Sequence, residues 1–200
     1  MPLTGFDLSI LDGRRIGFAM TGSFCTFSQI FPQIRRLCEL GAQVQPILSF
    51  NAYQLDTRFY TSGEVRSQLK TICGKEIWHT LQEVEPIGPK KMLDLLIVAP
   101  CTGNTLGKLS SGIIDTPVTM AVKSHLRNSR PVLLAVSTND GLNTSARSIG
   151  ELMVRRNIYF VPFEQDDPDG KPASLVARMN LIVESAAAAL KGTQLPPLCG

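Results

Sequence analysis

The chain has 200 residues, of which 44% are hydrophobic and 18% are charged, and its formal net charge is +3. This composition indicates a folded globular domain and excludes a disordered chain, and no apolar run approaches the roughly 20 residues needed to cross a bilayer. The small positive charge comes from scattered basic pairs with no interleaved aromatic residues, so it predicts no nucleic-acid partner.

The first half of the chain predicts two units of strand, turn and helix. Residues 15–20 form an apolar run that ends in a polar turn, and apolar side chains from Phe27 to Cys38 then recur at helical spacing. Pro32 should delay or bend this helix. A second strand is predicted over 44–49, where a proline at position 46 indicates an edge or irregular position. Residues 64–72 predict a helix, and the pattern over 77–84 is ambiguous.

The strongest strand signal is the continuous apolar run over 95–99, which ends at Pro100 and opens into small polar residues. A helix interrupted at Gly112 is predicted over 106–114. The next helix begins at Pro117, because a capping threonine precedes a proline in its first turn.

Two more strands and two more helices complete the predicted elements. The strands are predicted over 132–136 and 158–163, with a helix between them that ends near Arg156. Apolar residues from Leu175 to Leu190 predict a final helix, which ends before Gly192.

Strands separated by helix-length segments predict a parallel sheet with right-handed crossovers. We therefore expect a single α/β domain over residues 1–193, with a doubly wound, Rossmann-like sheet of the flavodoxin type and helices on both faces. Residues 194–200 should form a loose tail. Because the carboxyl ends of parallel strands meet at one edge, the polar residues after four strands should converge there. These are residues 21–23, 49–51, 102–105 and 137–139.

Hydroxyls, backbone amides and a helix N-terminus at one edge predict an anion site. A dinucleotide site is excluded, since no G-x-G-x-x-G follows the first strand. The segment from Gly103 to Lys108 is not a Walker A motif, because only three residues separate its glycines and Leu109 replaces the magnesium-binding Ser or Thr. A mononucleotide with one phosphate, such as FMN, suits these groups without a metal.

The cysteines and histidines predict no metal site. The five cysteines are never closer than 13 residues, which excludes CxxC spacing and disfavours a disulfide framework. Cys25 and Cys101 should be small buried hydrophobic residues. His79 and His125 have no partner at ligand spacing, and His125 should lie on the surface of a basic helix. Residues 1–11 show no secretory pattern, so we expect a cytoplasmic protein with no membrane contact.

The segments Pro100–Lys108 and Gly112–Asp115 resemble the P-A-S-A-N-T-x-x-K…G-x-x-D signature of the FMN-binding flavoprotein family. That family includes phosphopantothenoylcysteine decarboxylases, peptidyl-cysteine decarboxylases and flavin prenyltransferases. Residues 21–23 and Ser49 are similar to its phosphate loops. With the convergence argument, the resemblance implies that FMN binds at Thr21, Gly22, Ser23, Phe24, Ser49, Asn51, Pro100, Thr102, Gly103, Asn104, Thr105, Ser137, Thr138 and Asn139.

A closer resemblance, to the family of dipicolinate synthase B subunits from spore-forming bacteria, covers nearly the whole chain. It rests on the segments 21–26, 85–89, 99–104, 126–131, 137–140, 157–163 and 165–168. The resemblance implies a sporulation enzyme of the mother-cell cytoplasm that oxidises a dihydrodipicolinate-type dicarboxylate to pyridine-2,6-dicarboxylate. It also implies a partner, the dipicolinate synthase A subunit, that binds NAD(P), and a homo-oligomer, trimeric or higher. Catalytic residues stay unassigned.

Two departures separate this chain from the decarboxylase branch. Glu85 and Pro86 lie where that branch has a catalytic histidine, and only Asn139 remains of its P-A-M-N segment. His79 is too far upstream to be the same histidine. Two alternatives therefore stay open: a non-catalytic assembly or binding subunit with a vestigial flavin site and, less favoured, a flavin-dependent decarboxylase.

Overall fold

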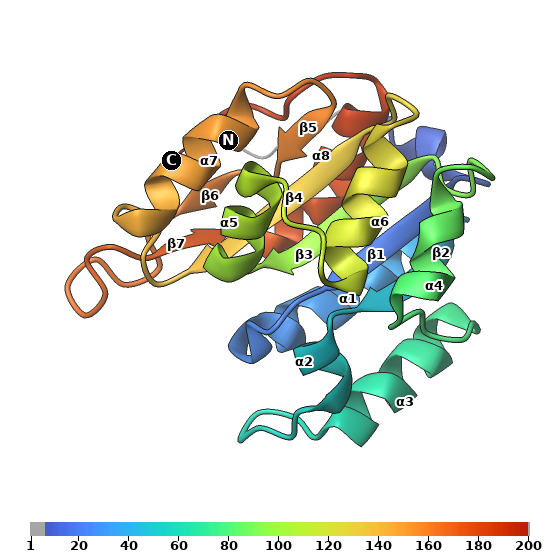
Figure 1. Ribbon diagram of the computed structural model, residues 1–200, viewed down its shortest axis with the longest axis horizontal. Coiled ribbons are helices and arrows are strands. Elements are labelled where there is room, and N and C mark those ends of the chain that lie inside the picture. The colour runs from blue at the N-terminus through green and yellow to red at the C-terminus, as the bar shows by residue number, and fades with distance from the viewer. Residues whose placement is uncertain (1–6, 200) are drawn as a thin grey trace.

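The computed structural model describes residues 7–199. The fold is built on a seven-stranded sheet (Figure 1). Its parallel part has the order β2 (Gln43–Leu48), β1 (Arg15–Met20), β3 (Leu95–Cys101), β4 (Val132–Thr138) and β5 (Ile158–Phe160). This 2-1-3-4-5 order is that of flavodoxin-type doubly wound folds, as predicted. The proline at position 46 lies in the edge strand β2, where its missing N–H costs no ladder bond to a further strand.

An antiparallel extension of the sheet was not predicted. Strand β7 (Leu175–Ala177) pairs antiparallel with the end of β4, and β6 (Phe163–Glu164) pairs with β7. The strand predicted over 158–163 is confirmed over 158–160 as β5 but is too long, because the chain leaves β4 after Val161 donates its N–H to Leu134 and then forms the separate strand β6. Leu175 belongs to β7 and not to the predicted final helix.

Helices cover both faces of the sheet. One face carries α1 (Phe27–Glu39) and α8 (Ile182–Leu190), and the other carries α5 (Gly103–Ser111), α6 (Pro117–Leu126) and α7 (Thr144–Met153). The short helices α2 (Phe50–Gln54) and α4 (Leu81–Val84) and the longer α3 (Ser62–Cys73) lie near the β2 edge (Figure 1). Short 3₁₀ turns occupy Leu8–Leu11, Phe24–Thr26, Glu85–Ile87 and Met179–Leu181. Within residues 7–199, no helix is long and apolar enough to span a membrane.

Several predicted boundaries move for local reasons. Strand β3 continues through Pro100 to Cys101, with a shift in its register against β4 after Val98. Helix α5 starts at Gly103, three residues earlier than predicted, because Thr102 caps it by accepting the backbone N–H of residue 105 at 3.4 Å. It ends at Gly112, whose φ of 71° is a left-handed conformation that suits glycine.

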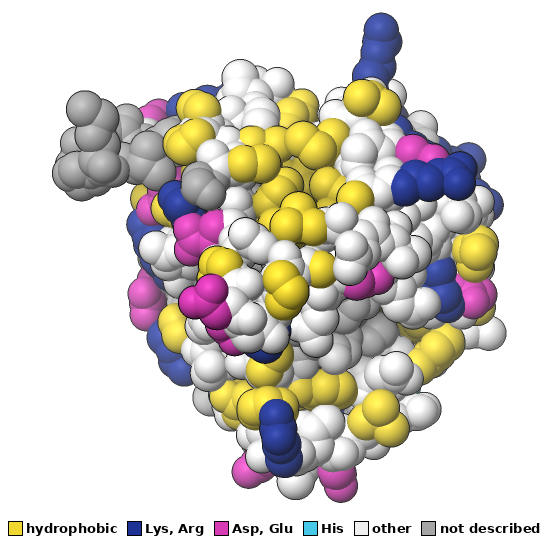
Figure 2. All heavy atoms as spheres, turned by 90° about the vertical axis from the view of Figure 1, so that its left-hand side faces the viewer, with side chains coloured by type: hydrophobic (Ala, Val, Ile, Leu, Met, Phe, Trp, Pro, Cys, Tyr) yellow, Lys and Arg dark blue, Asp and Glu magenta, His cyan; other side chains and the backbone are white. Residues whose placement is uncertain are grey.

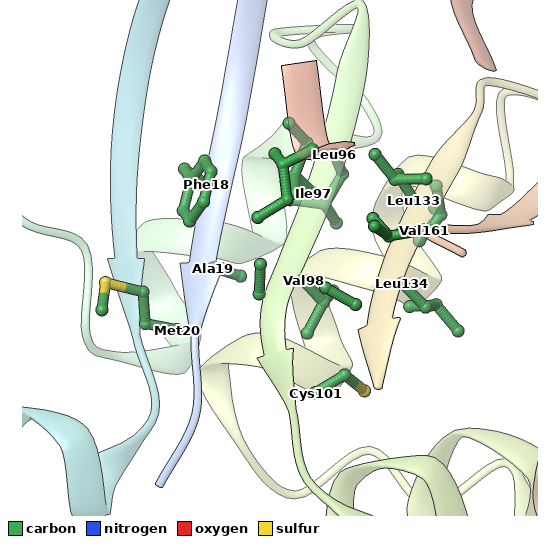
Figure 3. Close-up of a cluster of buried hydrophobic side chains, with 14 of the residues drawn as sticks. Phe18, Ala19, Met20, Leu96, Ile97, Val98, Cys101, Leu133, Leu134 and Val161 are labelled. Atoms are coloured by element: carbon green, nitrogen blue, oxygen red, sulfur yellow. The ribbon is translucent and has the colours of Figure 1, made fainter. Parts of the chain in front are cut away.

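The core lies between the central strands and the two helical layers. Every residue of β3 is buried, as are residues 132–137 of β4. Figure 3 shows the side chains of Phe18, Ile97 and Leu133 arranged across neighbouring strands. Each fully buried side chain of this size contributes about 1.5–3 kcal/mol, so these strands fix the sheet that positions the loops at its edge.

Three sequence-based expectations about single positions are wrong. His125 is 1% exposed, because its face of α6 packs inward and its Nε2 lies 3.0 Å from the carbonyl oxygen of Pro131. Cys25 is exposed, whereas Cys101 is buried as expected. The tail is also attached to the sheet: the Gln194 side chain bonds both backbone groups of Phe160, at 2.8 and 2.7 Å, and the carbonyl oxygen of Leu198 accepts the N–H of Phe163 at 3.0 Å.

Candidate functional site

The exits of β1 and β3 are joined by one threonine. The hydroxyl of Thr21 donates to the carbonyl oxygen of Pro100 at 2.7 Å and accepts the backbone N–H of Thr102 at 3.1 Å. The two threonine hydroxyl oxygens are 3.4 Å apart. These bonds hold the loop after β1 against the N-terminus of α5, where the first backbone N–H groups have no partner within the helix.

The exit of β4 joins the same edge. Oγ of Ser23 lies 2.7 Å from Oγ of Ser137, so the loops after β1 and β4 are in direct contact. Asp140 accepts hydrogen bonds from Thr138 at 2.5 Å and from Ser145 at 2.6 Å. These two hydroxyls hold the pKa of the Asp140 carboxyl below its ordinary value, so it stays an anion that fixes the loop after β4.

The first cavity at this edge, of about 380 Å³, lies between the exits of β1, β2 and β3. No acidic side chain lines it in the part of the chain that the structure describes, and its one cation is Lys108. The ammonium of Lys108 lies 2.8 Å from both carboxylate oxygens of Asp115. The lining residues are Thr21, Gly22, Ser49, Phe50, Asn51, Thr102, Asn104, Thr105, Lys108 and Thr116.

A second cavity, of about 600 Å³, adjoins the first and shares Gly22 and Thr102 with it. It extends over the exits of β1 and β4 toward the loop after α2 and the loop between β6 and β7. Its other lining residues are Ser23, Phe24, Cys25, Thr26, Gln29, Thr57, Arg58, Phe59, Gly103, Ser137, Thr138, Asn139, Asp166, Lys171 and Val176.

The structure thus brings the residues proposed from sequence to one edge but divides them between two cavities. Pro100 lines neither cavity, because it is buried in β3 and contributes its carbonyl oxygen to Thr21. Sequence reasoning did not include Lys108 in the site, although the residue belongs to the P-A-S-A-N-T-x-x-K signature. It also missed Arg58 and Lys171, for which no motif gave a signal. Among residues 7–199, no three His, Cys, Asp or Glu side chains are grouped to hold a metal ion.

The chain belongs to the flavoprotein family, whose model matches residues 8–162. It is 44% identical to the B subunit of dipicolinate synthase from Bacillus subtilis over 191 residues, which are 96% of each chain. The crystal structure of the dipicolinate synthase B subunit from Bacillus halodurans superposes with a TM-score of 0.88 at 43% identity, covering 95% of this chain and 97% of that one.

More distant structures share the fold alone. AnUbiX in complex with FMN and dimethylallyl pyrophosphate aligns with a TM-score of 0.59 at 21% identity, over 74% of this chain and 77% of that chain. The shared architecture is the doubly wound sheet.

Proposed function

We propose that this chain acts as the B subunit of a dipicolinate synthase and takes part in oxidising a dihydrodipicolinate-type intermediate to pyridine-2,6-dicarboxylate during sporulation. The observation that carries the proposal is the 44% identity to a dipicolinate synthase B subunit over 96% of both chains. Such a protein works with an A-type partner that binds NAD(P), in the cytoplasm of the mother cell. The oxidation removes a hydride and a proton from the ring, so it needs a hydride acceptor.

The first cavity suits the phosphate of FMN. Its lining offers the hydroxyls of Thr102 and Thr105, which lie 3.0 Å apart, and the positive end of helix α5, with no lining carboxylate in the part of the chain described. Lys108 adds an ammonium that Asp115 pairs with from outside the lining, and Thr21 positions the loop because its own hydroxyl already donates to Pro100. Ser49 and the amides of Asn51 and Asn104 add further donors or acceptors at its rim. These residues would bind and orient the cofactor, and a bound flavin would supply hydride acceptance.

Apart from Pro100, the remaining proposed cofactor residues line the second cavity, where they would meet the molecule on which the cofactor acts. They are Ser23, Phe24, Gly103, Ser137, Thr138 and Asn139. A flavin in the first cavity and a substrate in the second would be neighbours, because the two cavities share Gly22 and Thr102.

The variant Asn104→Ala tests the cofactor site. Asn104 is exposed at the start of α5 and lines the first cavity, so its removal should weaken FMN binding roughly 3–10-fold, as expected for one lost hydrogen bond, without unfolding the protein. Flavin absorbance and calorimetry of the purified chain measure the binding. Asn180→Ala, an exposed position away from both cavities, is the matched control.

Activity of the reconstituted two-component enzyme completes this experiment. Dipicolinate formation should require both components and should fall in Asn104→Ala but not in Asn180→Ala. If the parent chain binds no FMN, the cofactor part of the proposal is wrong. If dipicolinate forms equally well with Asn104→Ala, the chain is a non-catalytic assembly subunit.

The assembly alternative is favoured by one observation. Among the described residues, no histidine lines either cavity. His79, whose ring stacks on Tyr53 with centroids 3.7 Å apart, lies in a separate cavity with Glu83. The same observation disfavours a flavin-dependent decarboxylase that uses a histidine.

A further inference from the structure

Two segments that line the second cavity have no role in the proposed cofactor site. The floor of this cavity is the edge of the sheet at Ser23 and Ser137, and its walls are two segments far apart in the sequence. One wall is residues 57–59, after α2, and the other is the loop between β6 and β7, which contributes Asp166 and Lys171. The position and charge of these walls indicate what the cavity can bind.

The walls carry a net positive charge. Arg58 and Lys171 are the two cations and Asp166 is the one carboxylate among the described lining residues, which leaves one positive charge. Lys171 is already partnered, since its Nζ lies 3.2 Å from Oδ2 of Asp166, whose other oxygen accepts from Ser174. Arg58 has no carboxylate within 4.0 Å in the described part of the chain. The guanidinium of Arg58 is therefore available to an anion.

The floor supplies uncharged donors opposite this cation. Ser23 and Ser137 share one hydrogen bond of 2.7 Å, so only one of their two hydroxyl hydrogens is used between them. The other can donate to a ligand. The side-chain amides of Gln29 and Asn139 are further donors in the same lining.

Aromatic rings complete the cavity. Phe24 and Phe59 both line it, and the guanidinium carbon of Arg58 lies 4.8 Å from the centroid of the Phe59 ring. Phenyl side chains provide apolar contact for a planar ring, and a cation beside such a ring favours a ligand that is both aromatic and acidic.

We propose that this second cavity binds the planar ring dicarboxylate of the reaction, with Arg58 pairing with one carboxylate and the hydroxyl and amide donors of the floor binding the other. The inference rests on the proposed function. It adds where the substrate binds and which residues of the chain select it. Lys171 lies in the opposite wall, where Asp166 balances its charge. The molecule lies beside the first cavity, in contact with Gly22 or Thr102, which line both.

Calorimetric titration of the full-length, FMN-saturated chain with pyridine-2,6-dicarboxylate tests the proposal. Arg58→Gln should weaken binding at least tenfold, because it removes a charge-assisted pair, and Arg58→Lys should retain part of the affinity. Arg35→Gln, an exposed arginine on α1 outside both cavities, should bind like the parent chain. Pyridine-2-carboxylate, with one carboxylate, should bind at least tenfold more weakly than the dicarboxylate.

Two outcomes would overturn the assignment: no binding of the dicarboxylate to the parent chain, or equal binding by Arg58→Gln and the parent chain. Titrating FMN into the same variants separates this inference from the proposed function. If FMN binds and the reconstituted enzyme makes dipicolinate while Arg58→Gln binds the dicarboxylate normally, only the location of the substrate is wrong. If the reconstituted enzyme makes no dipicolinate, the proposed function fails.

Discussion

Replacement of the buried histidine should change how the stability of the protein depends on pH. His125 is 1% exposed, and burial is the main cause that lowers its pKa from 6.5 to about 4. The nearby Arg130 guanidinium lowers the pKa further, whereas Asp94 and the hydrogen bond to Pro131 oppose the shift. A hydrogen bond to a carbonyl requires that Nε2 carries the proton of the neutral ring, and the buried Nδ1 has no hydrogen-bond partner among residues 7–199.

The sign of the effect follows from proton binding in the two states. Below about pH 6.5 the unfolded chain takes up a proton at His125, whereas the folded chain does not until about pH 4, so stability falls as the pH falls. For these two pKa values, the free energy of unfolding drops by about 2 kcal/mol between about pH 7.5 and about pH 5. The carboxyls with lowered pKa values, such as Asp94 and Asp140, lose their contribution only at more acidic pH.

Urea denaturation at the two pH values measures this difference. His125→Gln removes the titrating ring and should lose most of the pH dependence, although the variant is less stable at neutral pH. His79→Gln, at a half-buried position outside both cavities, should keep the dependence of the parent chain. If the free energy of unfolding of His125→Gln falls between the two pH values by as much as that of the parent chain, the reasoning is refuted.

Two further predictions concern the site and the surface. Gly103→Ala should lower the free energy of unfolding, measured by urea denaturation, by about 1–3 kcal/mol, because its Cβ would lie 2.7 Å from the hydroxyls of Ser145 and Thr138, which Asp140 holds in place. Gly150→Ala should show no loss, because no atom of the described residues lies within 4 Å of its Cβ. Hydrophobic side chains gather on the side of the molecule that carries α7 (Figure 2), and we propose self-association, trimeric or higher, through this surface. Val154, which is 84% exposed after α7, should then be buried between copies, so Val154→Glu should lower the mass measured by light scattering; an unchanged mass would exclude this surface.

The parallel sheet was predictable because its signals are local. Continuous apolar runs marked β3 and β4, and each run ended at residues that cap helices or make turns. The convergence of the strand exits followed from topology alone, because parallel strands of a doubly wound sheet end at one edge. The contact between Ser23 and Ser137 joins two such exits.

The parts that sequence reasoning missed depend on pairing between distant segments. Leu175, Met179 and Ile182 have helical spacing, yet Leu175 pairs with Thr138 in an antiparallel ladder. A three-residue strand is too short for its alternation to be distinguished from one turn of a helix. Likewise, nothing near Arg58 in the sequence indicates that its loop faces Lys171 across a cavity.

The antiparallel extension explains why the second cavity has a wall on the β4 side. Strand β5 pairs with β4 only as far as Leu134, so the end of β4 would otherwise be an open edge. Strand β7 takes that edge by pairing with Ser137 and Thr138, and this pairing places the loop between β6 and β7 beside the sheet edge. Ser137 is therefore both a ladder residue and part of the cavity floor. The pairing of β7 with β4 therefore both covers the free edge of β4 and positions Lys171. The second cavity thus depends on β4, which pairs parallel with β5 along its first part and antiparallel with β7 at its end.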